Sequence, residues 1–241
     1  MGLGTQSVVL GQDFRDISVD QQMPLGQIAP TSDGREFRYG KAGVSALAPG
    51  LMNVGPPVVP DHVNLVTAAA AVGATSVTVT LGATAATANQ YAGGVLYGNV
   101  TSTGLGIGYR IKGNPAADAS ATLVVQLDEP IVVAFTATTK INLFASQYNK
   151  AIVAPAAASA AVPVGVFTGA SLTAAYFGWL QVRGPAPLQC AATVYTLGET
   201  VTQSTQTAGN GTLGIDAQPI YGVAAQLGIS TQYQLVNLNL G

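Results

Sequence analysis

Short runs of alternating apolar and polar residues recur from about residue 61 onward, separated by turns rich in Gly, Pro and Asn. A period of two is typical of half-buried β-strands, because successive side chains point to opposite faces. Helical periodicity is weak, and the alanine runs at 68–71 and 156–158 predict at most a turn of helix each. Strands are expected at residues 77–81, 95–97, 107–112, 122–127, 131–135 and 141–144. The pattern predicts an all-β fold with little helix, built as a β-sandwich or a barrel.

The N-terminal quarter of the chain has a different texture. Residues 1–61 hold ten of the twenty charged residues and six of the 13 prolines. A segment of this composition buries too little apolar area to offset its ordering entropy, so we expect residues 1–60 to form an extended arm without a core of its own. One β-hairpin is expected within it, from residues 25–29 and 35–39, because Asp33-Gly34 is a strong turn signal.

Two β-rich regions are expected after the arm. The first covers residues 61–154 and the second covers residues 155–241. The Ala/Ser stretch between Pro155 and Pro163 indicates either a linker or an ordered crossover between them. The sequence leaves open whether the two regions share one core.

Charge is unusually scarce. The 241 residues include 9 Lys+Arg and 11 Asp+Glu, where an average chain of this length carries about 60 charged residues. A folded chain of this size exposes roughly 10,000 Å². So sparse a charge coat predicts that much of this surface is buried against other protein chains.

Several classes of partner and location are excluded by the same features. A formal net charge of −2 and the absence of a Lys/Arg run argue against nucleic acid as a partner. The longest apolar stretch, residues 151–166, is too short to span a bilayer and is broken by two prolines, and the first residues lack a secretory signal. We therefore expect a protein made in the cytoplasm, with no membrane partner.

Residues able to carry chemistry are few. Asp61-His62 is a metal-ligand pair or a polar connector, and Asp128-Glu129 is a carboxylate pair or an exposed turn before a proline; in both cases the second interpretation is favoured. Cys190 is expected to behave as a small buried apolar residue. The glycines of residues 104–108 lack the spacing of a nucleotide-binding loop and indicate a close approach of backbones. We expect no metal, no cofactor and no enzymatic activity.

Six segments together resemble tailed-bacteriophage head decoration proteins, also called capsid cement proteins. They are Leu25–Gln27, Asp33–Tyr39, Lys41–Gly43, Tyr91–Gly94, Ile111–Ala117 and Gly178–Pro185. The resemblance implies a structural virion protein on the outer capsid surface that stabilises the shell by bridging subunits of the major capsid protein, and that pairs with itself as a dimer or trimer. The residues we expect at the capsid or self interface are Arg35, Phe37, Arg38, Tyr39, Tyr176, Phe177 and Trp179.

Two alternatives stay open at the level of sequence. A glycan- or receptor-binding module on the head surface would expose the aromatic cluster of residues 176–179. A domain of a tail or baseplate hub would be present in few copies per particle.

Overall fold

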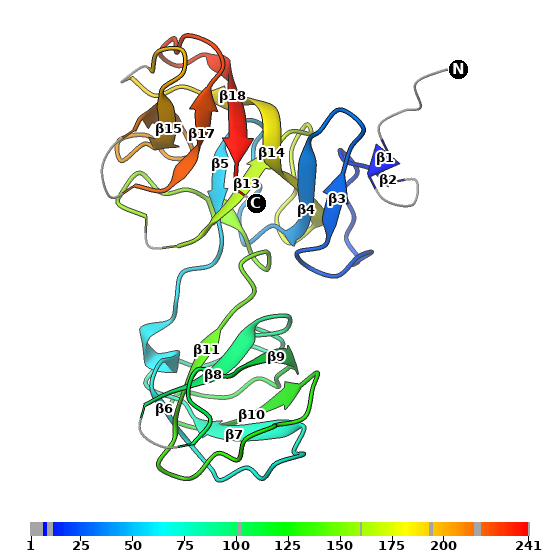
Figure 1. Cartoon of the computed structure of the whole chain (residues 1–241), viewed down its shortest axis with the longest axis vertical. Coiled ribbons are helices and arrows are strands. Elements are labelled where there is room, and N and C mark those ends of the chain that lie inside the picture. Colours follow the sequence, from blue (N-terminus) through cyan, green and yellow to red (C-terminus); the bar gives the residue numbers. More distant parts are fainter. Residues whose placement is uncertain are drawn as a thin grey trace. The chain divides into compact units, whose positions relative to one another are not determined.

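A computed structural model describes residues 7–8, 12–100, 103–159, 161–192, 195–214 and 218–240. Over these ranges the chain forms 18 strands and one short 3-10 helix, Pro60–His62, which confirms the all-β prediction (Figure 1). The chain divides into two compact units. One, the barrel unit, is residues 58–146; the other, the sheet unit, combines residues 1–57 with residues 147–241. The structure therefore differs from the expected sequence of arm, first region and second region, because the first and last segments fold together.

The barrel unit is a closed, antiparallel, six-stranded barrel. Its strands are β6 (Leu65–Thr67), β7 (Ser76–Thr80), β8 (Val95–Val100), β9 (Gly108–Gly113), β10 (Thr122–Leu127) and β11 (Lys140–Phe144), closed in the order β10-β7-β6-β11-β8-β9. Five of the six strands expected from the sequence are present. The sixth, at residues 131–135, is a loop with one isolated bridge between Phe135 and Ala70, so that prediction was wrong.

Alternation along the barrel strands directs every second side chain into the barrel interior, and these side chains fill it. In β7 and β10, Val77, Val79, Leu123 and Val125 are fully buried, while the residues between them face outward. The glycine-rich segment 104–108 has the close approach of backbones that its composition indicates, because a Cβ on Gly98 would lie 3.0 Å from the Gly104 carbonyl oxygen, and the Gly106 N–H donates to the Gly98 carbonyl at 3.0 Å. Burial of the apolar half of each strand stabilises the barrel by removing that area from water.

The sheet unit contains a curled antiparallel sheet and a separate two-stranded ribbon of β1 (Ser7–Val8) and β2 (Gln12–Asp13). The remaining strands are β3 (Ile28–Pro30), β4 (Glu36–Lys41), β5 (Met52–Val54), β12 (Ile152–Val153), β13 (Pro163–Phe167), β14 (Phe177–Gln189), β15 (Thr200–Gln203), β16 (Gly211–Leu213), β17 (Ile220–Ala224) and β18 (Tyr233–Asn239). Their order is β12-β5-β13-β14-β18-β17-β15-β16, and the β3–β4 hairpin joins through β4 to β14.

The 13-residue strand β14 organises this sheet. Its first half pairs with β4, from Phe177 opposite Lys41, and its second half pairs with β18, up to Gln189 opposite Tyr233 (Figure 1). Pro185 and Pro187 lie in the second half and have no N–H to donate. Their nitrogens share the parity of Gln189, whose N–H donates to the Gly50 carbonyl at 2.9 Å rather than to β18. The prolines therefore leave the ladder with β18 intact.

The segment expected to be an extended arm contributes strands to this sheet. The predicted hairpin is confirmed, with Ala29 opposite Phe37 and Gly34 at φ 84° in the turn. Met52 and Val54 of β5 are buried as well. Strands β13 and β14 supply the surface against which the apolar residues of this segment are buried, so its own composition does not decide its order. Residues 1–6 and 9–11, also part of the expected arm, lie outside the described residues.

The described residues of the Ala/Ser stretch between Pro155 and Pro163, which exclude residue 160, form a crossover. Strands β12 and β13 pair with opposite edges of β5, so the connection between them must pass across that strand. The Gln203 side-chain amide donates to the carbonyls of Pro155 and Ala157, at 2.8 and 3.1 Å. Of the two interpretations of this stretch, the structure has the crossover.

Candidate interaction surfaces

The aromatic residues expected at an interface come from two adjacent strands. Tyr39 of β4 lies opposite Trp179 of β14, and their rings meet edge to face at 5.0 Å between centroids. Phe177 stacks on Tyr39 at 6.0 Å, and Phe37 belongs to the same cluster. All four side chains are buried, with Trp179 only 1% exposed. Because the strands are paired in this register, alternation places the four rings on one face of the sheet.

A segment of the same chain covers this face. We call residues 12–22 the strap. Phe14 stacks on Phe37 at 4.8 Å, and Ser18 exchanges both backbone hydrogen bonds with Phe177, at 3.0 and 2.8 Å. The Gln22 N–H donates to the Tyr39 hydroxyl at 3.0 Å, and the Trp179 indole N–H donates to the Gln12 side chain at 3.3 Å. The cluster that sequence reasoning assigned to a partner is thus packed against its own strap.

Cationic side chains lie over the aromatic rings of this region. The Arg35 guanidinium lies 4.7 Å from the centroid of Phe14 and 5.6 Å from that of Phe37, and Arg15 lies 4.4 Å from Phe14. Lys41 lies 4.9 Å from Phe177. These cation–π contacts keep the charges at the surface while their stems cover the rings.

Arg35 also forms an ion pair in the hairpin turn. Its Nε lies 2.8 Å from a carboxylate oxygen of Asp33. The Thr31 hydroxyl donates to the same carboxylate and, with Arg35, lowers the pKa of Asp33 to about 2. A hydrogen bond to the charged form favours ionisation, which is why the carboxyl group stays deprotonated well into acid.

The two other residues expected at the interface lie elsewhere. Arg38 points to the opposite face of β4, where it donates to the Gly26 carbonyl at 3.1 Å and lies 5.9 Å from the Tyr148 ring centroid. Tyr176 is half-buried against a separate apolar cluster that includes Leu172. Contact of these seven side chains with another subunit stays a prediction. For the buried aromatic residues it requires the strap to move.

The candidate metal pair Asp61-His62 is part of the barrel's internal bonding. His62 Nε2 lies 2.8 Å from the Thr84 carbonyl, which can only accept, so Nε2 carries the proton and Nδ1 accepts from the Tyr91 hydroxyl. Asp61 accepts from the Thr84 hydroxyl at 2.6 Å. Burial raises the pKa of Tyr91 to about 12. In the described part of the chain no three His, Cys, Asp or Glu residues gather as metal ligands.

The other candidates have structural surroundings too. Asp128 pairs with the Arg110 guanidinium at 3.2 Å, and the Glu129 carboxylate accepts a hydrogen bond from the backbone N–H of Arg110 at 3.3 Å, in the turn that follows β10. Cys190 is fully buried, and desolvation raises the pKa of its thiol. These positions agree with the interpretations of a turn and of a buried apolar residue.

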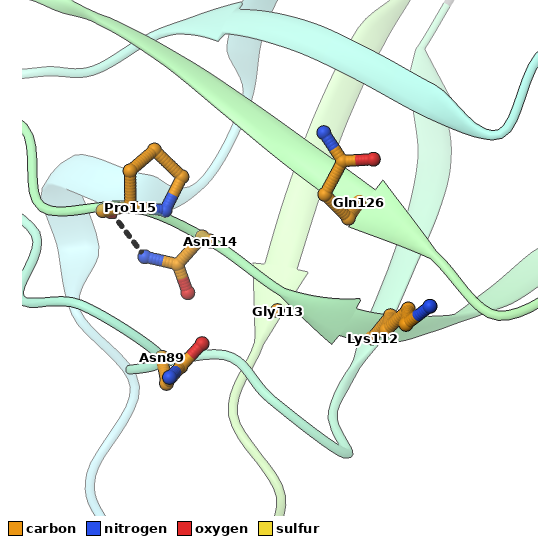
Figure 2. A pocket seen from close by; sticks show the side chains of 6 residues that line it. All are labelled: Asn89, Lys112, Gly113, Asn114, Pro115 and Gln126. Atoms are coloured by element: carbon orange, nitrogen blue, oxygen red, sulfur yellow. Dashed lines mark hydrogen bonds between the residues drawn. The ribbon is translucent and has the colours of Figure 1, made fainter.

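A shallow pocket of about 440 Å³ lies on the barrel unit, lined by Asn89, Lys112, Gly113, Asn114, Pro115 and Gln126 (Figure 2). The Asn114 side chain is buried and forms hydrogen bonds with the neighbouring loop. The polar ends of Lys112 and Gln126 point away from Asn114 (Figure 2). The lining offers amide and ammonium donors but neither an aromatic ring nor a nucleophile. Its polar groups do not converge on one point.

The surface that sequence reasoning missed is the outer face of the second half of β14, β18 and β17. Pro185 lies opposite Asn237, which lies opposite Val223, and Pro187 lies opposite Leu235; all five are exposed. Tyr233 extends this face and is 52% exposed. A signal was available, because residues 184–241 contain only two charged residues, Glu199 and Asp216.

Apolar exposure is widespread in the described ranges. Twenty large apolar side chains are exposed there, as many as the charged residues of the whole sequence. Seven of these twenty lie between residues 197 and 235: Leu197, Ile220, Val223, Leu227, Ile229, Tyr233 and Leu235. Apolar exposure on this scale is typical of a protein that contacts other protein chains.

No family model matches the chain, and no curated protein or solved structure is significantly similar to it. An assignment of function therefore depends on the surfaces described above. Among the residues that the structure describes, none lies in a helix long and apolar enough to cross a membrane.

Proposed function

We propose that this chain is a structural virion protein that binds the outer surface of a tailed-phage capsid and stabilises the shell by bridging subunits of the major capsid protein. The observation that carries the proposal is the composition of the surface, which has few charged side chains and many exposed apolar ones. In the described ranges Val44, Val72, Val132 and Leu197 are each more than 60% exposed. Permanent interfaces are depleted in charge and resemble a core cut in half, so such a surface is suited to lifelong contact with other chains.

The division into two units supports a bridging role. Each unit has its own apolar core, of which Leu96 and Ile111 in the barrel unit and Val166 and Leu188 in the sheet unit are examples. Two compact units, each with its own core and joined by two chain segments, can each contact a different capsid subunit. Contacts that are individually weak then add through effective concentration on the lattice, and a protein that binds only the assembled shell stabilises it by mass action.

The alternative, a glycan-binding module built on residues 176–179, has less support. Sugar rings stack on exposed aromatic faces, whereas Phe177 and Trp179 are buried beneath the strap. The barrel pocket has no aromatic residue in its lining.

The test is reconstitution on capsids of the virus that encodes the chain. Capsids lacking the protein are incubated with the purified full-length chain, and their disassembly on heating is compared with that of capsids given buffer or heat-denatured protein. We expect binding at hundreds of copies per particle and disassembly at a higher temperature. Binding governed by apolar burial also changes little between about 50 and 500 mM salt, because screening acts on charges. No binding, or a few copies per particle, would refute the proposal.

A further inference from the structure

We propose that the outer face of β14, β18 and β17 is a self-association surface, on which a second copy of this chain docks about a two-fold axis. The face comprises Pro185, Pro187, Val223, Tyr233 and Leu235, with amide side chains between and beside them. It is formed entirely by the sheet unit and is continuous across three paired strands, with β18 between β14 and β17 (Figure 1). The inference deepens the proposed function by naming one partner.

The register shows that the face is regular. Outward residues stand opposite outward residues, as in the row from Pro185 through Asn237 to Val223. Inward residues stand opposite inward residues, with Val236 between Ala186 and Ala224, and all three are buried. Two such faces pack at about 10 Å, like the layers of a β-sandwich.

The charge pattern selects a second copy over an unlike partner. In a two-fold interface each side chain near the axis meets its own copy, so any charge there meets a like charge. On this face Arg183 at one end is charged, and its guanidinium pairs with Glu36 of the same chain at 3.1 Å. The exposed positions between Gln189 and Arg183 carry no charge on β14 or on the paired residues of β18.

The polar groups of the face are also self-complementary. Asn237 and Asn239 of β18 are exposed and project from the same side as Leu235. A carboxamide both donates and accepts, so identical amides facing each other across a two-fold axis can bond reciprocally. Carboxylates or ammonium groups in these positions would not allow this pairing.

The area of the face is smaller than that of a stable interface. Seven residues of β18 span about 24 Å and three strands span about 14 Å, giving a footprint of about 340 Å². Stable complexes bury about 800 Å² per partner. The loop between β17 and β18 carries exposed Leu227 and Ile229, and its Gly228 N–H donates to the Tyr195 carbonyl at 2.7 Å, beside exposed Leu197. The pairing is therefore weak in free solution and is strengthened when copies share a lattice.

Sedimentation velocity of the full chain tests this inference without any capsid. We expect concentration-dependent dimers between about 1 and 300 μM. Leu235→Lys and Val223→Lys, tested separately, should each weaken dimerisation at least about tenfold, because two ammonium groups then meet across the axis. Val132→Lys is the matched control, an exposed valine of the barrel unit replaced in the same way, and should dimerise like the parent chain.

The outcomes separate this inference from the proposed function. A chain that stays monomeric at every concentration, or dimers that both face variants leave unchanged, would overturn it. Circular dichroism melts of the variants exclude loss of folding as the cause, since both side chains are already exposed. If the parent chain is monomeric but Leu235→Lys abolishes capsid binding, the face docks on the shell and the second copy is excluded. If the chain dimerises but does not bind capsids, only the proposed function is refuted.

Discussion

Replacing Asn114 by aspartate exchanges one NH₂ group for oxygen at the centre of a buried network. The side-chain oxygen accepts the Tyr91 N–H at 3.0 Å, and the amide nitrogen donates to the carbonyls of Thr87 and Pro115 at 2.9 and 2.8 Å. Asn114 is 4% exposed. Its side chain therefore fastens the loop before β8 to the end of β9.

The size of the effect follows from these three bonds. In Asn114→Asp the bond from Tyr91 survives, but both donated bonds are lost and a carboxylate faces two carbonyl oxygens. Leaving a buried polar group without its partner costs about 1–3 kcal/mol, and more for a charge. We expect the free energy of unfolding to fall by about 3–5 kcal/mol at pH 7.

The pH dependence separates electrostatics from simple loss of packing. Burial against carbonyls raises the pKa of the introduced carboxyl above its value in the unfolded chain. The native state then binds the proton more tightly, so acidification restores part of the stability, and one donated bond is regained. Asn114→Ala, which loses all three bonds, should be destabilised without this pH dependence. It is the matched control.

Urea unfolding followed by circular dichroism at pH 7 and pH 4.5 measures both variants against the parent chain. The difference between Asn114→Asp and the parent should be smaller at the lower pH, and that between Asn114→Ala and the parent should be the same at both. An aspartate variant within about 0.5 kcal/mol of the parent at pH 7 would show that the amide does not hold these loops.

Three further substitutions test other parts of the molecule. Trp179→Ala should lower the free energy of unfolding by about 3–5 kcal/mol in urea titrations, since the indole is buried, and a loss below about 1 kcal/mol would contradict the packing beneath the strap. Thr31→Val should raise the pKa of Asp33 from about 2 toward its usual value in an NMR titration of the carboxyl carbon. Because the folded pKa lies below the unfolded one, the Asp33 interactions stabilise the fold above pH 4 and are lost as pH falls toward 2, so a parent pKa near 3.8 would refute the assignment. Gly94→Ala should destabilise the chain by about 1–3 kcal/mol in thermal melts, because a Cβ there would lie 2.1 Å from the Phe144 carbonyl oxygen, and an unchanged melt would show that the backbones are farther apart.

Local signals in the sequence were sufficient for five of the six barrel strands and for the hairpin, whereas β6 was not predicted. Alternation at residues 76–80 and 122–127 needs only side chains that point to opposite faces, and Asp33-Gly34 needs only a residue that tolerates positive φ. Each of these features is specified within about ten residues. The prediction failed at residues 131–135, where Ile131 and Phe135 are buried and Val132 is exposed, all within a loop instead of a strand.

Features that depend on distant residues were not predictable in this way. Strand β14 contains Gly184, Pro185 and Pro187, which indicate a break in sequence, and it continues only because the proline nitrogens face away from β18. The burial of Trp179 depends on Gln12 and its neighbours, 167 residues earlier, and no periodic signal in the strap predicts that contact. Charge scarcity predicted a contact surface, but the register of β17 and β18 was needed to propose a position for it.

The barrel unit is an insertion in the sequence of the sheet unit, and the two segments of the sheet unit that flank the insertion lie side by side. Val54 of β5 pairs with Ile152 of β12, and a Cβ on Gly55 would lie 2.8 Å from the Gln147 carbonyl, so the exit and return points of the chain are neighbours in the sheet unit. Insertions whose two ends emerge side by side can be exchanged with little disturbance of the host. A tripeptide joining Pro57 to Gln147 should therefore leave a folded remnant. We expect that a foreign domain can be inserted at the same junction in place of residues 58–146.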